Sequence, residues 1–215
     1  MNFLLRLSLF IALLILLPFL IIIYIILFLE LKENPIFVQK RALSLNHPKF
    51  KIYKLRTMAT SKVPDVNSVF VKDKNLYDVK GFRLWLRKTG IDEMPQLINI
   101  IKGDMNLIGP RPFTIPDLEI LKKHDLELYL KREAIKSKPG ITGYWQVFGN
   151  RKEGLKNVIE FDKYFDMNKN LKLKYKIFIR TLKILFFAKH TDSLLSFSSA
   201  DNQIEEIEKL SGTTV

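Results

Sequence analysis

The sequence opens on an uncharged apolar run, LSLFIALLILLPFLIIIYIILFL, which occupies residues 7–29. At a rise of about 1.5 Å per residue, a helix of roughly 23 residues is long enough to cross the hydrocarbon core of a bilayer. The run passes straight into Glu30, Leu31 and Lys32, without the small-residue cleavage site of a secretory signal. We therefore expect this segment to remain attached and to place the protein at a membrane.

Pro18 stands in the middle of the run. Because proline removes a backbone donor and clashes with the preceding turn, it kinks or breaks a helix. From these residues alone, a kinked spanning helix is the simpler interpretation, and a re-entrant helix that returns to the same side is the alternative. Lys32, Lys40 and Arg41 follow the run, whereas Arg6 precedes it, so the positive-inside rule places the remainder in the cytoplasm.

The 215-residue chain carries a formal net charge of +13, and almost all of this excess lies after the apolar run. Basic chains bind anions such as nucleic acid, acidic lipid head groups or phosphorylated small molecules. The absence of cysteine excludes disulfides, thiolate catalysis and sulfur-ligated metals. His47, His124 and His190 are far apart and lack zinc-like spacing, so we interpret them as surface or loop residues. Chemistry therefore depends on carboxylates, hydroxyls, basic side chains or a hard cation.

Short elements are predicted after the apolar run. Residues 36–38 and 50–53 are compatible with strands, and Asn46-His47-Pro48 between them is a turn signal. Residues 60–78 are polar and irregular and predict a surface loop. Residues 81–88 predict a short basic helix that ends at Gly90.

The next segment, IDEMPQLINIIKG at residues 91–103, predicts a helix with an acidic start. Pro95 suits a first helical turn, and Gly103 is a natural stop. Asp92 and Glu93 therefore lie at or just before a helix N-terminus, where the helix dipole keeps a carboxylate ionised. Adjacent acids can divide labour, one attacking while the other holds Mg²⁺, although acidic residues in a first turn are also common for stability alone.

Cations flank this acidic pair in sequence. Arg87 and Lys88 precede it, and Lys102 and Arg111 follow it. The planar fork of arginine suits phosphate oxygens, and a solvated charged surface is the alternative interpretation. In Gly109-Pro110-Arg111-Pro112, two prolines restrict the backbone around one arginine, so the main chain that carries this cation should be rigid.

Two further helices and a loop are predicted downstream. Residues 117–136 predict one longer helix of mixed charge, and Gly and Pro punctuate a loop at residues 138–143. The last helix is basic and amphipathic, with an apolar face suited to a lipid interface; packing on the protein core is the alternative. Its apolar positions are Leu171, Tyr175, Phe178, Leu182 and Leu185, and its cations include Lys172, Lys176, Arg180 and Lys183.

Several blocks of the sequence resemble the bacterial sugar transferase family, the small monotopic polyprenyl-phosphate phosphoglycosyl transferases. The resemblance runs in order from about residue 35 to residue 187. Its blocks are YKLRTM at 53–58, LRKTGIDEMPQL at 86–97 continuing through KGDM at 102–105, GPRP at 109–112, and KPGITG at 138–143 followed by Gln146-Val147.

This resemblance implies transfer of a sugar-1-phosphate from a UDP-sugar to undecaprenyl (polyprenyl) phosphate, with release of UMP, as the first membrane step of surface glycan assembly. Asp92 would be the nucleophile that carries the phosphosugar, and Glu93 would help to coordinate Mg²⁺. The implied contacts to substrate phosphate are Arg87, Arg111, Lys54 and Arg56.

The implied fold is α+β and predominantly helical, with interfacial amphipathic helices. Residues 1–31 would form a re-entrant membrane helix, 32–189 the catalytic domain on the cytoplasmic face of the bacterial inner membrane, and 190–215 a polar tail. Leu17 replaces a serine that often precedes the proline in this family, which bears on the sharpness of the bend. Residues 32–35 lack the usual Ser-Pro-Gly character, and Asn106 replaces a common serine.

Two hypotheses from other classes compete with this one. A membrane-tethered nucleic-acid-binding protein would be compatible with the charge, but the sequence lacks a helix-turn-helix signature and its aromatics concentrate in the apolar segments, so no nucleic-acid partner is expected. A non-catalytic scaffold of glycan assembly would not need the Asp92-Glu93 pair. Within enzymes, the alternative is a lipid-linked transferase with a different donor diphosphate. No motif specifies the sugar or an oligomeric state.

Overall fold

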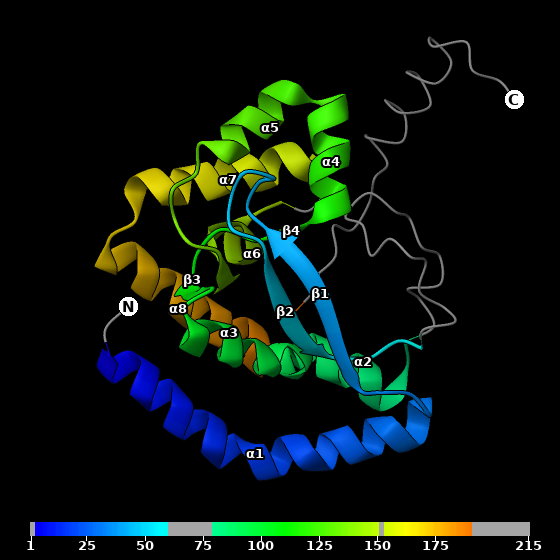
Figure 1. Ribbon diagram of the computed structural model, residues 1–215. Helices are drawn as coiled ribbons and strands as arrows, with labels where there is room; N and C mark the ends of the chain where they lie inside the picture. The colour runs from blue at the N-terminus through cyan, green and yellow to red at the C-terminus, as the bar shows by residue number, and fades with distance from the viewer. Residues whose placement is uncertain (1–2, 60–78, 151–152, 191–215) are drawn as a thin grey trace, which may run out of the picture.

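The computed structural model describes residues 3–59, 79–150 and 153–190. It confirms an α+β architecture that is predominantly helical. Figure 1 shows a long bent helix, α1, lying beneath a body of shorter helices that surround a small sheet. The predicted loop at 60–78 and almost all of the predicted tail lie outside the described residues.

Helix α1 spans Phe3–Leu31 and contains Pro18, so the predicted membrane element is one long helix that ends at the predicted boundary. It is bent near its middle, with its concave side toward the body (Figure 1), as expected of a proline that removes a ladder hydrogen bond. Within the described residues, it is the single helix long and apolar enough to cross a membrane.

Both halves of α1 pack on the same body. In the C-terminal half, Ile23 and Leu27 are buried in a cluster with Leu86 of the body. In the N-terminal half, Leu9 packs against a second cluster that contains Ile100. A straight spanning helix could place only one of its halves beside a domain on one side of the bilayer. The contact of both halves with one body therefore depends on the bend in α1.

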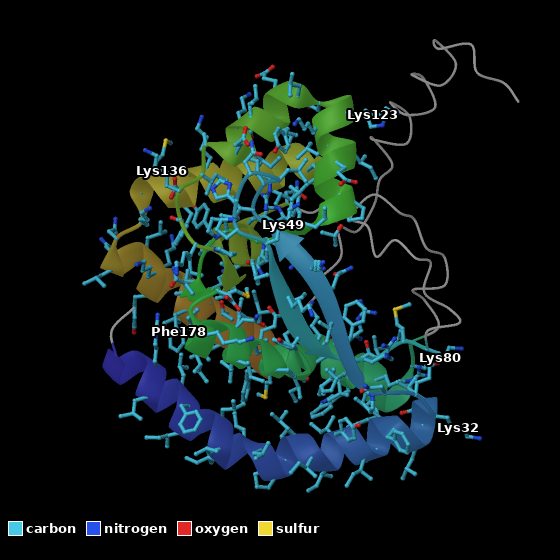
Figure 2. All side chains as sticks on the ribbon, viewed as in Figure 1. Lys32, Lys49, Lys80, Lys123, Lys136 and Phe178 are labelled. Atoms are coloured by element: carbon cyan, nitrogen blue, oxygen red, sulfur yellow. The ribbon has the colours of Figure 1, made fainter. Side chains whose placement is uncertain are left out.

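The polar groups near the two ends of α1 also contact the body. Glu30 accepts a hydrogen bond of 2.8 Å from Nε of Arg83. Near the other end, the guanidinium of Arg6 lies against Gly103. The outward side of the helix carries hydrocarbon side chains (Figure 2), and this continuous apolar surface is suited to lipid.

The predicted strands form an antiparallel hairpin. Strand β1 spans Ile36–Ala42 and β2 spans Phe50–Leu55, so both are longer than predicted. Strand β4, Phe113–Thr114, pairs with the far end of β1 and completes a sheet of order β2-β1-β4.

A second, two-stranded sheet corrects the prediction of a simple loop at residues 138–143. Strand β3, Asn106–Ile108, runs parallel to β5, Gly140–Thr142. The two chains approach so closely here that an added Cβ at Gly140 would lie 2.1 Å from the main-chain nitrogen of Gly109. A side chain at that position would force the segments apart.

The helices that carry the acidic pair follow their sequence signals. Helix α2 spans Gly81–Thr89 and ends at Gly90, whose φ of 68° is left-handed as predicted for a C-cap. The 3-10 helix η3, Ile91–Gln96, follows at once and continues into α3, Leu97–Lys102, which Gly103 terminates. The predicted helix start is thus confirmed, with a tighter first turn than an α-helix has.

The prediction of one helix over residues 117–136 is wrong. The segment forms α4, Ile115–His124, and α5, Leu126–Glu133, with a break at Asp125. The Asp125 carboxylate accepts a hydrogen bond of 2.8 Å from the main-chain N–H of Leu128 and so caps α5. This local bond competes with a continuous helix.

The C-terminal part is helical. Helix α6 spans Tyr144–Phe148, α7 spans Gly154–Asn168 and α8 spans Leu171–Phe186. Helices α4, α5 and α7 lie on the side of the sheet away from α1, whereas α2 and α3 lie close to α1 (Figure 1). One core cluster joins α4, α5 and α7 to the sheet and includes Phe113, Leu118, Tyr129, Trp145 and Ile159.

Helix α8 has one side packed on the protein core and another apolar side that is exposed, so it has features of both interpretations that the sequence left open. Ile177 is fully buried and packs with Val147 and Phe165 of the body. Most of the predicted apolar stripe lies on another side, where Leu171 is 85% and Tyr175 is 67% exposed, whereas Leu185, its last member, lies against Gly90. The helix therefore packs on the core through one apolar face and leaves a second one uncovered.

Candidate active site

The acidic pair lies in the turn between α2 and α3. The left-handed Gly90 ends α2, and its carbonyl accepts a hydrogen bond of 3.1 Å from the main-chain N–H of Glu93. Both carboxylates belong to the first turn of η3 and are largely buried, with Asp92 8% and Glu93 6% exposed. The turn therefore presents two neighbouring acids in a site that excludes most water.

Lys54 reaches this pair from the sheet. Its Nζ lies 2.5 Å from Oε1 of Glu93, and both side chains are shielded from solvent. A charge-assisted contact of this kind is short and fixes the orientation of both partners. Lys54, one of the predicted phosphate-binding residues, thus forms an ion pair with the acidic dyad, Asp92 and Glu93.

Arg87 and Arg56 lie on segments adjacent to the dyad. Arg87 is half-buried in the last turn of α2, where its Nη1 lies 3.3 Å from Sδ of Met58. Arg56 follows β2; its Nε donates to the main-chain oxygen of Asn34 at 2.9 Å, and its guanidinium stacks over Phe37.

Arg111 lies outside the strands, in the segment that leads into β4. It is 8% exposed and lies two residues before β4, which pairs with β1 at Arg41, whereas Lys54 pairs with β1 at Phe37. Four residues of strand separate these two pairings, which corresponds to roughly 13 Å. Lys54 and the Arg111 segment thus approach β1 near opposite ends.

A buried ion pair that the sequence did not indicate holds the Arg111 segment. Arg132 of α5 and Asp162 of α7 are almost fully buried, with Nη1 and Oδ2 3.3 Å apart. Burial raises the pKa of Asp162 to about 6, although Arg132 opposes this, and burial lowers the pKa of Arg132 to about 10. Two single charges on separate helices form no local pattern, so no sequence signal marked them.

His190, interpreted as a surface or loop residue, contacts the end of α2. Its main-chain N–H donates to the oxygen of Lys88 at 2.9 Å, and its Nδ1 lies 3.0 Å from the oxygen of Arg87. The segment after α8 therefore supports the helix that leads into the dyad.

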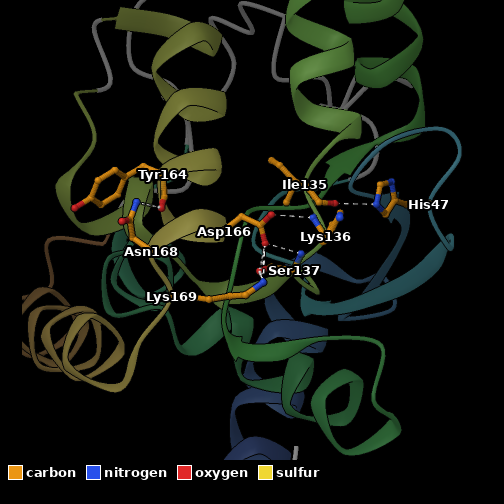
Figure 3. A network of polar contacts seen from close by, with 8 residues as sticks. All are labelled: His47, Ile135, Lys136, Ser137, Tyr164, Asp166, Asn168 and Lys169. Carbon is orange, nitrogen blue, oxygen red and sulfur yellow. Dashed lines mark hydrogen bonds and ion pairs between the residues drawn. The ribbon is translucent and has the colours of Figure 1, made fainter.

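A second polar network stabilises the loop after α5 (Figure 3). Asp166 accepts hydrogen bonds from the hydroxyl and main-chain N–H of Ser137, the main-chain N–H of Lys136 and the ammonium of Lys169. Partial burial works to raise the pKa of Asp166, but these hydrogen bonds outweigh it and lower that pKa to about 2. His47 joins the same loop through the main-chain oxygen of Ile135 at 3.0 Å. We interpret this network as structural.

The dyad fits a shared rather than a dedicated metal site. Over the described ranges, no three His, Asp or Glu side chains gather in a way that would hold a metal by themselves. Mg²⁺ usually takes one or two carboxylates together with substrate phosphates and water. Glu93, the predicted metal ligand, supplies one such carboxylate, so the donor set fits Mg²⁺ bound together with a diphosphate.

The fold and the site define a protein with an apolar membrane-type helix and a buried, cation-flanked acidic pair close to it. The chain belongs to the bacterial sugar transferase family, whose model matches residues 3–188. It is 32% identical to an undecaprenyl-phosphate galactose phosphotransferase of Salmonella typhimurium over 63% of this chain and 30% of that protein. It is 34% identical to the uncharacterized sugar transferase EpsL of Bacillus subtilis over 70% of this chain and 69% of that protein.

A third relative is the exopolysaccharide production protein ExoY of Sinorhizobium fredii, which is 31% identical over 68% of each chain. The aligned part of this chain thus spans less than a third of the Salmonella relative and about two thirds of EpsL and ExoY. The similarity to the longer protein concerns one part of it.

Proposed function

We propose that this protein transfers a sugar-1-phosphate from a UDP-sugar to undecaprenyl phosphate, releasing UMP, as the first membrane step of a surface glycan. The observation that carries the proposal is the position of the dyad beside the apolar helix. Ile91, next to Asp92, packs against the cluster formed by Ile23 and Leu27 of α1. A lipid-linked acceptor presents its phosphate at the bilayer surface, so an acidic site at the level of the anchor is where such a reaction needs it.

The name of the Salmonella relative supports the substrate class. We carry the lipid phosphate acceptor and the sugar phosphate donor to this chain, and leave the sugar open. Such a reaction also accounts for the excess of basic residues, because both substrates are phosphorylated.

In the first step, an Asp92 carboxylate oxygen attacks the β-phosphorus of the donor. The bond from this phosphorus to the bridging oxygen breaks, UMP leaves with the electron pair, and the sugar phosphate remains on Asp92 as an acyl phosphate. Partial exclusion of water protects this intermediate from hydrolysis.

In the second step, an oxygen of polyprenyl phosphate attacks the same phosphorus. The bond to Asp92 breaks, which regenerates the carboxylate and gives a polyprenyl diphosphosugar. Asp92 is thus the nucleophile of the first displacement and the leaving group of the second, so one acidic residue serves both steps.

The cations divide the phosphate charge between them. Lys54 holds Glu93 and lies where it can meet a phosphate oxygen, Arg87 approaches from α2, and Arg111 approaches from the other end of β1. Arg56 has a lesser role because Asn34 and Phe37 engage its guanidinium. Mg²⁺, held through Glu93, would neutralise the diphosphate and stabilise UMP as it leaves.

We further propose that α1 is re-entrant and that the body lies on the cytoplasmic face of the inner membrane. The support is the contact of both halves of α1, through Leu9 and through Ile23, with one body. The uncovered apolar face of α8 would rest in the same interface.

The test is release of UMP by the purified protein in nanodiscs with polyprenyl phosphate, Mg²⁺ and a panel of UDP-sugars. We expect one donor or a few related donors to release UMP. Without acceptor, the covalent step predicts exchange of labelled UMP into the UDP-sugar. Asp92→Asn should abolish both reactions, whereas Glu119→Gln on the exposed side of α4 should leave both unchanged. Turnover without UMP exchange would contradict the covalent step, and no turnover with any UDP-sugar would contradict the donor class.

A further inference from the structure

The loop Gly109–Pro112 is held by its main chain. The N–H of Gly109 donates to the oxygen of Thr142, and the oxygen of Pro110 accepts from the N–H of Gly140, both at 2.9 Å. The oxygen of Pro112 accepts from Nη1 of Arg41 at 3.0 Å. Since the two prolines have no N–H and a fixed φ, little conformational freedom is left in this segment.

The buried ion pair completes this arrangement at Arg111 itself. The main-chain N–H of Arg111 donates to Oδ2 of Asp162 at 3.2 Å, and its carbonyl oxygen accepts from Nη2 of Arg132. The peptide groups on both sides of Arg111 are therefore bound by the two members of one ion pair.

The Arg132 side chain is itself held by several contacts. Its Nε donates to the main-chain oxygen of Leu43 at 2.7 Å, and its guanidinium lies 3.5 Å from the centroid of the Phe113 ring. One planar fork thus joins the segment after β1, the ion-pair partner on α7 and the Arg111 carbonyl. Lysine could not satisfy three such acceptors in one plane.

We infer that Arg132 and Asp162 are positioning residues that fix Arg111 for contact with the donor phosphate; this inference rests on the proposed function. A buried ion pair is an expensive way to stabilise a core, since well-packed apolar residues often do as well. Here both members bind the main chain of one residue, and that residue carries a cation in a loop held by further main-chain hydrogen bonds at Gly109, Pro110 and Pro112. The main chain from which the Arg111 side chain projects is therefore fixed, as catalytic preorganisation requires.

A double-mutant cycle tests this inference. Arg132→Lys retains the charge but loses the fork, and we expect it to lower kcat/KM for the UDP-sugar by about tenfold or more, the scale of coupling within one network. Most of the effect should be on the donor KM, with the acceptor KM little changed. In the Arg111→Ala background, Arg132→Lys should have little further effect on kcat/KM.

The matched control is Tyr129→Phe, also on α5. It removes the hydroxyl that accepts from the main-chain N–H of Leu45 and donates to Glu133. We expect its small effect to be independent of Arg111. If Arg132→Lys lowers kcat/KM equally in the presence and absence of Arg111, the pair has a general structural role and the inference is wrong.

Asp162→Asn provides a second variant for the case in which Arg132→Lys does not fold. Its amide oxygen can still accept from Arg111, so a smaller rise in donor KM is expected, again confined to the background that contains Arg111. If Arg111→Ala alone leaves donor kinetics unchanged in an active wild-type preparation, the positioning role is wrong while the transferase proposal stands. An inactive wild type would instead contradict the proposed function.

Discussion

Lys54 of β2 and Glu93 of η3 form a largely buried ion pair with 2.5 Å between Nζ and Oε1. The contact joins two segments 39 residues apart. It ties the sheet to the turn that carries Asp92, so the position of the dyad depends on the hairpin as well as on its own helix.

Lys54→Ala should therefore reduce turnover strongly. Glu93 would lose its counter-charge in a site with little water, and the substrate phosphate would lose a cation. We expect kcat/KM for the UDP-sugar to fall by about a hundredfold, the scale for removing one preorganised charge. Lys51→Ala removes a charge from an exposed position of the same strand and should have little effect. Equal losses in both variants, measured by UMP release, would show that strand charge rather than the ion pair matters.

The bend in α1 leads to the prediction that both of its ends lie on the same side of the membrane. The protein contains no cysteine, so single cysteines can be introduced and labelled to test this. Arg6→Cys and Lys32→Cys place single thiols just outside the two ends of the apolar run. If α1 is re-entrant, a membrane-impermeant maleimide that reaches the periplasm should label neither in intact cells and both after the inner membrane is opened. Lys123→Cys on α4 reports the side on which the body lies. Labelling of Arg6→Cys in intact cells would support a spanning helix.

The network at Asp166 predicts a pH-dependent contribution to stability. The pKa of this carboxyl falls from 3.8 to about 2 on folding, so its contribution is fully present above pH 3.8 and is lost as the pH falls toward 2. Asp166→Asn should lower the free energy of unfolding by about 1 kcal/mol near neutral pH, allowing for solvent screening. Chemical unfolding at several pH values in the same detergent measures this difference.

For Asp166→Asn, the difference from wild type should disappear as the pH approaches 2. Glu160→Gln on the exposed side of α7 is the control and should change little at any pH. A deficit that stays constant across the acidic range would contradict the role of the ionised carboxylate.

Local signals predicted much of the fold. The apolar run, the left-handed glycines at 90 and 103 and the first hairpin all depend on neighbours within a few residues, and each is confirmed. The resemblance, together with the helix-start pattern, predicted Asp92 and Glu93 as the catalytic pair, and the structure buries both carboxylates in one turn. What the resemblance could not give is the arrangement of the cations around them.

The features that were missed depend on contacts between distant segments. Strand β5 exists because it pairs with β3, more than 30 residues away, and a run of three residues containing Gly140 has no strand signal of its own. Arg132 and Asp162 meet across 30 residues of sequence and act on Arg111 of a third segment. The break at Asp125 had a local cause, a capping aspartate, which competed with the helical pattern around it.

His190, which follows α8, contacts the end of α2 just before the dyad, and this contact leads to a further prediction. Nδ1 of His190 lies 3.0 Å from the oxygen of Arg87, and Leu185 of α8 lies against Gly90, so the turn before Asp92 is held from the side of α8. His190→Ala removes one hydrogen bond, which is worth about 1 kcal/mol and corresponds to roughly a fivefold increase in local opening. We expect amide exchange at residues 87–93 to be faster by about this factor, and a smaller fall in kcat, because the closed form remains the major one. His124→Ala, at the exposed end of α4, should change neither quantity. Unchanged exchange at residues 87–93 in His190→Ala would show that α8 and the dyad are independent, whereas faster exchange together with a lower kcat would show that the packing of α8 affects the turn that carries Asp92.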